Sequence, residues 1–133
     1  MATTERPQHE GRRPYPKRAE IYLTSLDPTV GHEIRKTRPA LIIQNDISNR
    51  HGATTIVAPI TSTVRLPLSP VHVLLPAGPS TGLGVPSVAV FSQIRTVDRR
   101  RLIKKLGEAD RWIMSQVDQA IQVSLGLTPE SGA

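Results

Sequence analysis

Apolar residues along most of this chain come in short blocks that end at proline, glycine or asparagine. The first block, 21–26, is rich in residues that favour strands and ends at Asp27-Pro28, where proline disfavours further regular structure. The second, 38–44, is almost continuously apolar, as in a strand covered on both faces. The same pattern predicts further strands at 54–62, 71–75, 88–91 and 102–106.

Polar segments join these blocks. A charged loop, 27–37, lacks helical apolar spacing, and we expect it to be exposed and mobile. Asn45 and Asp46 predict the cap of a short helical turn. Pro59 lies inside a strand, which requires an edge position or a bulge. Short strands with turn signals at this spacing predict a small, closed or nearly closed antiparallel barrel.

The last part of the chain has a different period. Five apolar residues recur at the spacing of one helical face: Ile113, Val117, Ala120, Ile121 and Leu125. Asp110 fits the N-cap of this amphipathic helix, and Gly126 can adopt the left-handed conformation that ends it. We expect Trp112, on the first turn, to pack on the barrel. The predicted fold class is mainly β (α+β), a small antiparallel barrel with a C-terminal helix.

The length of 133 residues suits one domain with a core of its own. Residues 1–17 hold several prolines and cations with little apolar content, which predicts a disordered basic tail. We expect the barrel domain to span 18–127 and a frayed tail to occupy 128–133. No apolar run reaches the roughly 18 residues of a membrane span, and no secretion signal is present, so we expect no membrane contact and a cytoplasmic location.

Charge changes this picture. A net charge of +6 and a pI near 10.5 point to an anionic partner, of which nucleic acid is the commonest. Aromatic residues make up 3% of the chain, so base stacking on an aromatic sheet face is not expected. The densest basic cluster is a phosphate-binding face or an ordinary solvated one, and it comprises Arg95, Arg99, Arg100, Arg101, Lys104 and Lys105.

The residues that metal and thiol chemistry would need are absent or scattered. The chain has no cysteine, and its four histidines are scattered without a metal-binding spacing, so we expect no metal and no cofactor. Arg38, at the start of a buried strand, is placed either to bind phosphate or simply to be solvated. Thr61 ends the next strand and His72 lies within another, and neither signal is specific alone.

Seven blocks occur in an order that resembles the MazF/PemK toxins of bacterial toxin–antitoxin pairs. The resemblance runs from about Arg18 to Leu127. The blocks are Glu20-Ile21-Tyr22, the loop with Pro28, Gly31 and Glu33, Arg38 to Asp46, Val57 to Thr61, Pro70 to Val73, Gln93 to Thr96 and Ser124 to Leu127.

This resemblance implies an SH3-like barrel and a metal-independent, sequence-specific endoribonuclease that acts as a homodimer on single-stranded RNA. An acidic cognate antitoxin would neutralise it. The family's catalytic arginine and threonine match Arg38 and Thr61. Its RNA groove would place Glu33, His72, Gln93 and Arg95 near the substrate.

Two residues near the expected RNA surface depart from the family's pattern, and two alternative functions stay open. His32 and Ser92 differ from the residues common in the family, which affects the preferred cleavage sequence but leaves the reaction type unchanged. The same fold also serves toxins that poison DNA gyrase, against which the match of Arg38 and Thr61 argues. A basic barrel could instead bind nucleic acid without cutting it.

Overall fold

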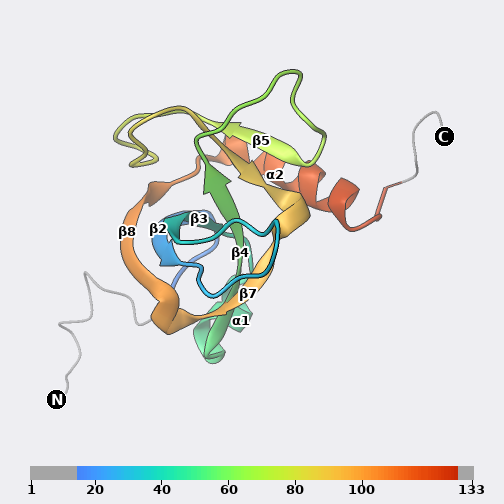
Figure 1. Ribbon diagram of the computed structural model, residues 1–133. Coiled ribbons are helices and arrows are strands. Elements are labelled where there is room, and N and C mark those ends of the chain that lie inside the picture. The colour runs from blue at the N-terminus through green and yellow to red at the C-terminus, as the bar shows by residue number, and fades with distance from the viewer. Residues whose placement is uncertain (1–14, 129–133) are drawn as a thin grey trace, which may run out of the picture.

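The computed structural model describes residues 15–128 of the chain (Figure 1). Its elements follow the order strand, strand, short helix, three strands, a 3-10 turn, a strand, a second 3-10 turn, a strand and a long helix. Their bounds are β2 Glu20–Ser25, β3 Thr37–Ile42, α1 Asp46–His51, β4 Thr54–Thr61, β5 His72–Leu75, β6 Ser87–Val90, η2 Phe91–Gln93, β7 Arg95–Asp98, η3 Arg99–Arg101, β8 Leu102–Glu108 and α2 Arg111–Ser124.

The strands pair antiparallel in the order β5-β6-β4-β3-β2-β8, and β7 pairs with β4 off that path. Strands β8, β2, β3, β4 and β7 curve around a common interior, and η3 connects β7 to β8 across the remaining side (Figure 1). Two irregularities in the register between β2 and β8 increase this curvature. The expected antiparallel barrel is therefore confirmed.

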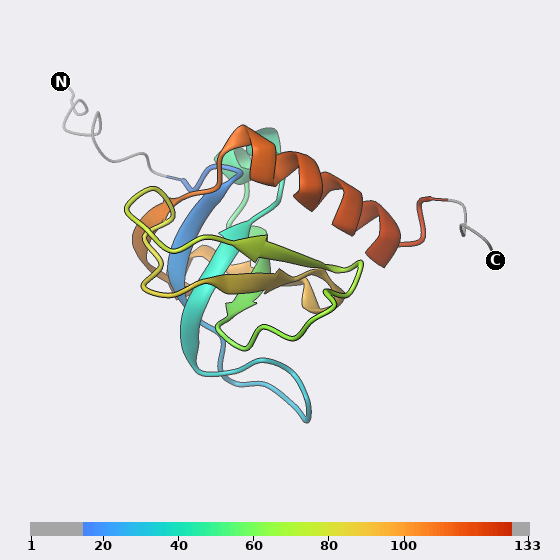
Figure 2. The same cartoon turned by 90° about the horizontal axis from the view of Figure 1, so that it is seen from above.

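Two apolar clusters lie on opposite faces of the central strands. Inside the curve, the smaller one joins β3, β4 and β7 through Ala40, Ile42, Val57 and Val97. On the outer face, the larger one packs against α2, which Figure 2 shows alongside β5 and β6. Val117 of α2 is fully buried there, and Asp110 caps the helix by accepting the N–H of Ile113 at 2.8 Å. Most of α2's stability therefore comes from burial of this face.

Three details differ from the sequence-based picture. Strand β7 was not predicted, because Arg95–Asp98 is short and three of its four residues are polar. The prediction that Trp112 packs on the barrel is wrong, since 76% of its surface is exposed. Trp112 precedes Ile113 by one position, about 100° around the helix from the buried stripe. Pro59 lies neither at an edge nor in a bulge but where β4 changes partner from β7 to β6.

The start of the folded part differs slightly from the expected boundary. Residues 1–14 of the predicted tail, and 129–133 at the other end, lie outside the described residues. Pro16, however, is buried, and the N–H of Lys17 donates to Glu20 Oε1 at 2.8 Å. Arg18 then joins three segments, bonding Ile43 O at 2.9 Å, Asp46 Oδ1 at 2.8 Å through its N–H, and Asp118 Oδ1 at 2.7 Å. The chain is therefore anchored from residue 16 onward.

Among the helices that the structure describes, none is long and apolar enough to cross a membrane. Within residues 15–128 there is also no group of three or more His, Cys, Asp or Glu side chains placed to hold a metal ion.

Candidate active site

Arg38 lies at the start of β3, where the curved strands open to solvent. Its strand partner is Thr24 of β2, and its guanidinium Nε donates to the carbonyl oxygen of Arg35 at 3.0 Å. This bond orients the side chain, while the two terminal nitrogens have no hydrogen bond among the described residues. Two N–H-bearing nitrogens at an open strand end can bind a phosphate in a fork geometry.

Thr61 lies at the end of β4, the strand next to β3. The recorded pairs of β3 and β4 run from Ile42 with Val57 to Ala40 with Pro59 and end there. Continued by two residues, the same register would place Arg38 opposite Thr61. Residues two positions apart on a strand project to the same face of the sheet, so Arg38 lies on the face of Ala40 and Thr61 on the face of Pro59. The Thr61 hydroxyl oxygen accepts the N–H of Thr63 at 3.2 Å, which leaves its hydroxyl hydrogen free to donate.

The loop between β2 and β3, residues 26–36, covers this open end and is fixed at several points. Glu33 Oε1 accepts the N–H of Val30 at 2.6 Å, and Asp27 Oδ1 accepts that of Lys36 at 3.0 Å. Arg95 of β7 donates from Nη1 to the carbonyl of Leu26 at 2.9 Å. The loop is exposed as expected, and these bonds give it a defined shape at both ends.

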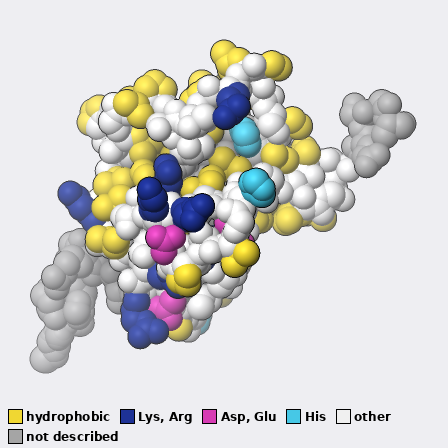
Figure 3. Space-filling model, in the orientation of Figure 1, with side chains coloured by type: hydrophobic (Ala, Val, Ile, Leu, Met, Phe, Trp, Pro, Cys, Tyr) yellow, Lys and Arg dark blue, Asp and Glu magenta, His cyan; other side chains and the backbone are white. Residues whose placement is uncertain are grey.

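Arg101 of η3 adds a contact that no sequence pattern indicated. Its Nη1 donates to the carbonyl of Ser25 at 3.2 Å and also to that of Asp27. These residues are more than 70 positions apart in the chain, so only the folded structure reveals the pair. Figure 3 shows lysine and arginine side chains gathered at the centre of the face onto which this loop opens, with a second group towards the lower left.

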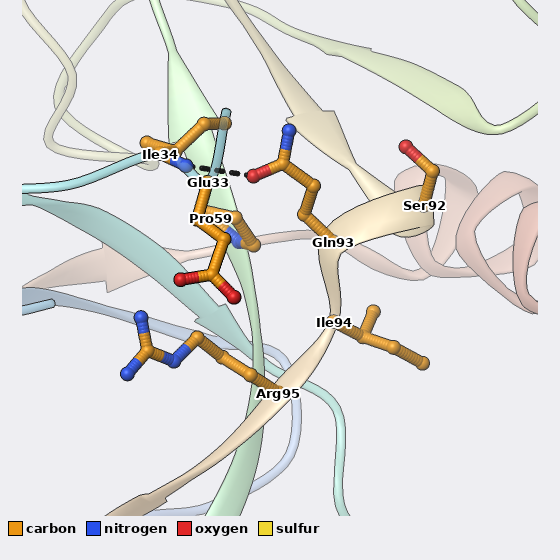
Figure 4. Close-up of a pocket in the computed structure, with 7 residues that line it drawn as sticks. All are labelled: Glu33, Ile34, Pro59, Ser92, Gln93, Ile94 and Arg95. Atoms are coloured by element: carbon orange, nitrogen blue, oxygen red, sulfur yellow. Dashed lines mark hydrogen bonds between the residues drawn. The ribbon is translucent and has the colours of Figure 1, made fainter. Parts of the chain in front are cut away.

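A pocket of about 290 Å³ lies beside the loop and contains three of the four residues expected to bind RNA, Glu33, Gln93 and Arg95. Gln93 Oε1 accepts the N–H of Ile34 at 2.7 Å and so ties the loop to η2. Figure 4 shows the carboxylate of Glu33 and the guanidinium of Arg95 on the same side of the pocket. No sequence pattern marks the other lining residues as a binding site, although Ser92 departs from the residue common in the family; they are Ile34, Pro59, Ser92 and Ile94.

His72 is not brought together with these residues. It opens β5, pairs with Val90 and lines a separate groove of about 290 Å³ between β5 and α2. Gln116 and Gln119 of α2 form the other wall of that groove. Within one chain, the candidate site therefore consists of the Arg38–Thr61 pair and the Glu33–Gln93–Arg95 pocket.

Within the basic cluster that begins at Arg95, the charge of Arg100 is neutralised by a carboxylate. Asp98 accepts from Arg100 at its N–H, 2.8 Å, and at two guanidinium nitrogens, 3.0 and 3.1 Å. These side-chain and backbone hydrogen bonds lower the pKa of Asp98 to about 2. Arg101 instead donates to backbone carbonyls, which carry no charge.

Comparison with known proteins agrees with the fold. The family described as PemK-like, MazF-like toxins of type II toxin–antitoxin systems matches residues 17–125, and the chain belongs to that family. Endoribonuclease EndoA of Bacillus subtilis (strain 168) is 43% identical over 111 residues, which cover 84% of this chain and 95% of that protein.

Solved structures give the same result. A crystal structure of MazF from Deinococcus radiodurans superposes with a TM-score of 0.71 at 28% identity, covering 84% of this chain and 97% of that one. An endoribonuclease in complex with its cognate antitoxin, from a mycobacterial species, superposes with a TM-score of 0.70 at 29% identity, covering 86% and 98%. This chain is thus a MazF-type toxin by fold and by sequence.

Proposed function

We propose that this toxin is a metal-independent endoribonuclease that cuts single-stranded RNA, including messenger RNA in the cytoplasm, with Arg38 and Thr61 as its catalytic pair. The observation that supports the proposal is the register of β3 and β4, whose continuation by two residues puts both side chains on one face of adjacent strands. Each side chain is oriented by one backbone contact and keeps donors free for a ligand. The similarity to an endoribonuclease at 43% identity supports the reaction class.

RNA supplies its own nucleophile for this reaction. The 2′-oxygen attacks the adjacent phosphorus, the bond from phosphorus to the 5′-oxygen breaks, and the 5′-oxygen takes up a proton while the 2′-oxygen loses one. The products are a 2′,3′-cyclic phosphate and a 5′-hydroxyl. The protein must mainly stabilise the charge that develops on the phosphate oxygens. Arg38 has donors and no acceptor, so we assign it to that charge, and Thr61 donates a hydrogen bond that holds the phosphate in line.

The neighbouring pocket suits the nucleotides beside the cleaved bond. Glu33 accepts hydrogen bonds, Arg95 donates them, and Gln93 can do both, so together they can read base edges. His72 contributes to substrate binding from the separate groove with α2. We assign these four side chains to RNA binding and not to the chemical step.

Substitution of the pair tests the assignment. Arg38→Ala and Thr61→Ala should each lower the cleavage rate of a mixed-sequence RNA about 100-fold or more, because each removes a donor to the reacting phosphate. Thr61→Ser keeps the hydroxyl and should retain most activity, whereas Arg38→Lys keeps the charge but loses the fork and should not. Gel analysis of RNA fragments formed in EDTA measures the rate, and circular dichroism verifies the fold.

Each other outcome has a clear meaning. A folded Arg38→Ala or Thr61→Ala variant that cuts RNA at the normal rate would remove that residue from the mechanism. If the unmodified protein binds RNA but yields no fragments, the chain is a basic binding barrel. Growth arrest with intact messenger RNA would favour a gyrase poison. Sequencing the 5′ ends of the fragments identifies the cleavage sequence.

Two partners complete the proposal. We infer that the chain forms a homodimer, supported by large apolar side chains that are exposed on α2 and at its C-cap, Trp112, Val123 and Leu125. Sedimentation equilibrium would contradict this if the mass stayed at 14.5 kDa across the micromolar range. We also infer an acidic cognate antitoxin, since related toxins have been crystallised with theirs and this chain carries a charge of +6.

A further inference from the structure

A row of cations leads away from the active site along the surface of the barrel. Arg35 and Lys36 are exposed just before Arg38, and Arg101 touches the carbonyls of Ser25 and Asp27 where the same loop begins. Arg101 is the last residue of η3, so the row continues directly into the two arginines before it. We call these five residues the basic strip: Arg35, Lys36, Arg101, Arg100 and Arg99.

We propose that RNA flanking the cleaved bond follows this basic strip from the barrel opening to η3, where the arginines hold its phosphates. The inference rests on the proposed ribonuclease function, because it assigns a path to the substrate of that site. It adds a contact surface outside the Arg38–Thr61 pair and outside the Glu33 pocket.

The electrostatics of the strip support an anionic occupant. Two carboxylates border it: Asp27 accepts the N–H of Lys36, and Asp98 binds Arg100. Arg35, Lys36, Arg100 and Arg101 against these two carboxylates give an excess of two positive charges. Arg101 bonds to backbone carbonyls, so those contacts do not cancel its charge.

The far end of the strip is a shallow hollow of about 520 Å³. It lies between α1 and η3 and is lined by His51, Gly52, Ala53, Asp98, Arg99 and Arg100. None of these is a large apolar side chain, so the hollow lacks the anchors on which protein partners depend. Guanidinium groups around an open hollow suit a phosphate and its nucleotide instead. Figure 3 shows the second group of basic side chains in the lower part of the molecule, where η3 lies in Figure 1.

Two single substitutions change the charge of η3 in opposite directions. Arg100→Gln removes a guanidinium whose side chain is 91% exposed. Asp98→Asn removes the carboxylate that neutralises it, and asparagine still caps the turn with its side-chain oxygen. Arg111→Gln is the matched control, since it removes one exposed cation from the start of α2.

Binding to uncleavable RNA tests the path. Fully 2′-O-methylated RNAs of about 8 and about 24 nucleotides, both of mixed sequence, are titrated by fluorescence anisotropy over a range of salt. We expect the longer RNA to bind more tightly and with a steeper salt dependence. Arg100→Gln should lower its slope by about 0.7 for one lost phosphate contact, and Asp98→Asn should tighten its binding. Arg111→Gln should do neither.

Other outcomes would overturn the path. Equal effects of Arg100→Gln and Arg111→Gln would show that only net charge matters, and no gain from Asp98→Asn would exclude phosphate contact at η3. If Arg100→Gln weakens binding of polyglutamate but not of RNA, the strip serves an acidic protein partner. Because 2′-O-methyl RNA lacks the nucleophile, this result stands apart from cleavage, so failure of the proposed function is detected separately.

Discussion

Arg38 illustrates how one side chain can be both positioned and available. Its Nε is committed to the carbonyl of Arg35, so the guanidinium has a defined orientation, and its two outer nitrogens make no hydrogen bond within residues 15–128. The sequence could place Arg38 at the start of a strand but could not tell a solvated arginine from a catalytic one. The proposed distinction depends on Thr61, which shares a face with Arg38 only when the register of β3 and β4 is continued past Ala40 and Pro59.

Gln93 offers a test of how the loop is held. Gln93→Leu keeps a similar volume but removes the oxygen that accepts the N–H of Ile34. A hydrogen bond of this kind contributes about 0.5–1.5 kcal/mol, so we expect KM for RNA to rise about 2- to 10-fold as the loop loses its position, and further if the side chain also contacts RNA directly. Steady-state cleavage kinetics give KM and kcat separately. Gln122→Leu, an exposed change on α2, is the control, and equal KM values for the two variants would contradict the role.

Asp98 leads to a prediction about acid stability. Its pKa is about 2 in the folded protein against an ordinary 3.8, so its ionised form favours the folded state above pH 3.8, and this contribution is lost as pH falls towards 2. Wild type should therefore unfold at a higher temperature than Asp98→Asn at pH 6, and the difference should shrink at pH 2. Thermal unfolding at low salt measures both, and a difference independent of pH would refute the assignment.

At the scale of elements, apolar periodicity predicted the strands and the helix, because burial imposes a period of 2 or 3.6 on the chain. It failed where burial is slight: β7 buries only Val97, and Trp112 lies off the helical stripe despite its size. Apolar periodicity also could not predict which distant residues form hydrogen bonds with each other. The contacts of Arg95 with Leu26 and of Arg101 with Ser25 join segments whose sequences carry no sign of each other.

The loop 76–86 crosses β8 and is another contact between segments that lie far apart in the sequence. The N–H of Glu108 donates to Ser80 O at 2.9 Å, and a Cβ on Gly107 would lie 2.3 Å from that same oxygen. Gly107→Ala should therefore lower the free energy of unfolding by about 1–3 kcal/mol, the usual cost of overpacking. Gly84→Ala, with nothing within 4 Å of its Cβ position, should change it by less than about 0.5 kcal/mol. Urea denaturation of both variants decides the matter.

For the whole molecule, the net charge of +6 leads to a prediction about its proposed partners. An acidic antitoxin segment should compete with RNA for the cationic surface, and its displacement of RNA should weaken as salt rises, since exposed charges are screened within about 10 Å at 0.1 M. Anisotropy of labelled 2′-O-methyl RNA, titrated with antitoxin at several salt concentrations, follows the competition. If antitoxin affinity does not change with salt and RNA stays bound, the antitoxin and the RNA occupy separate surfaces.

Three arginines near the barrel opening have the same kind of hydrogen-bond partner. Arg38, Arg95 and Arg101 each donate to a backbone carbonyl and not to a carboxylate. A guanidinium carries several donors, so a carbonyl can take up one of them without supplying a negative charge. These contacts consequently fix the side chains before any ligand arrives. An anion that enters the opening would then meet arginines that are already oriented, and its binding would cost less side-chain entropy than binding to freely rotating ones.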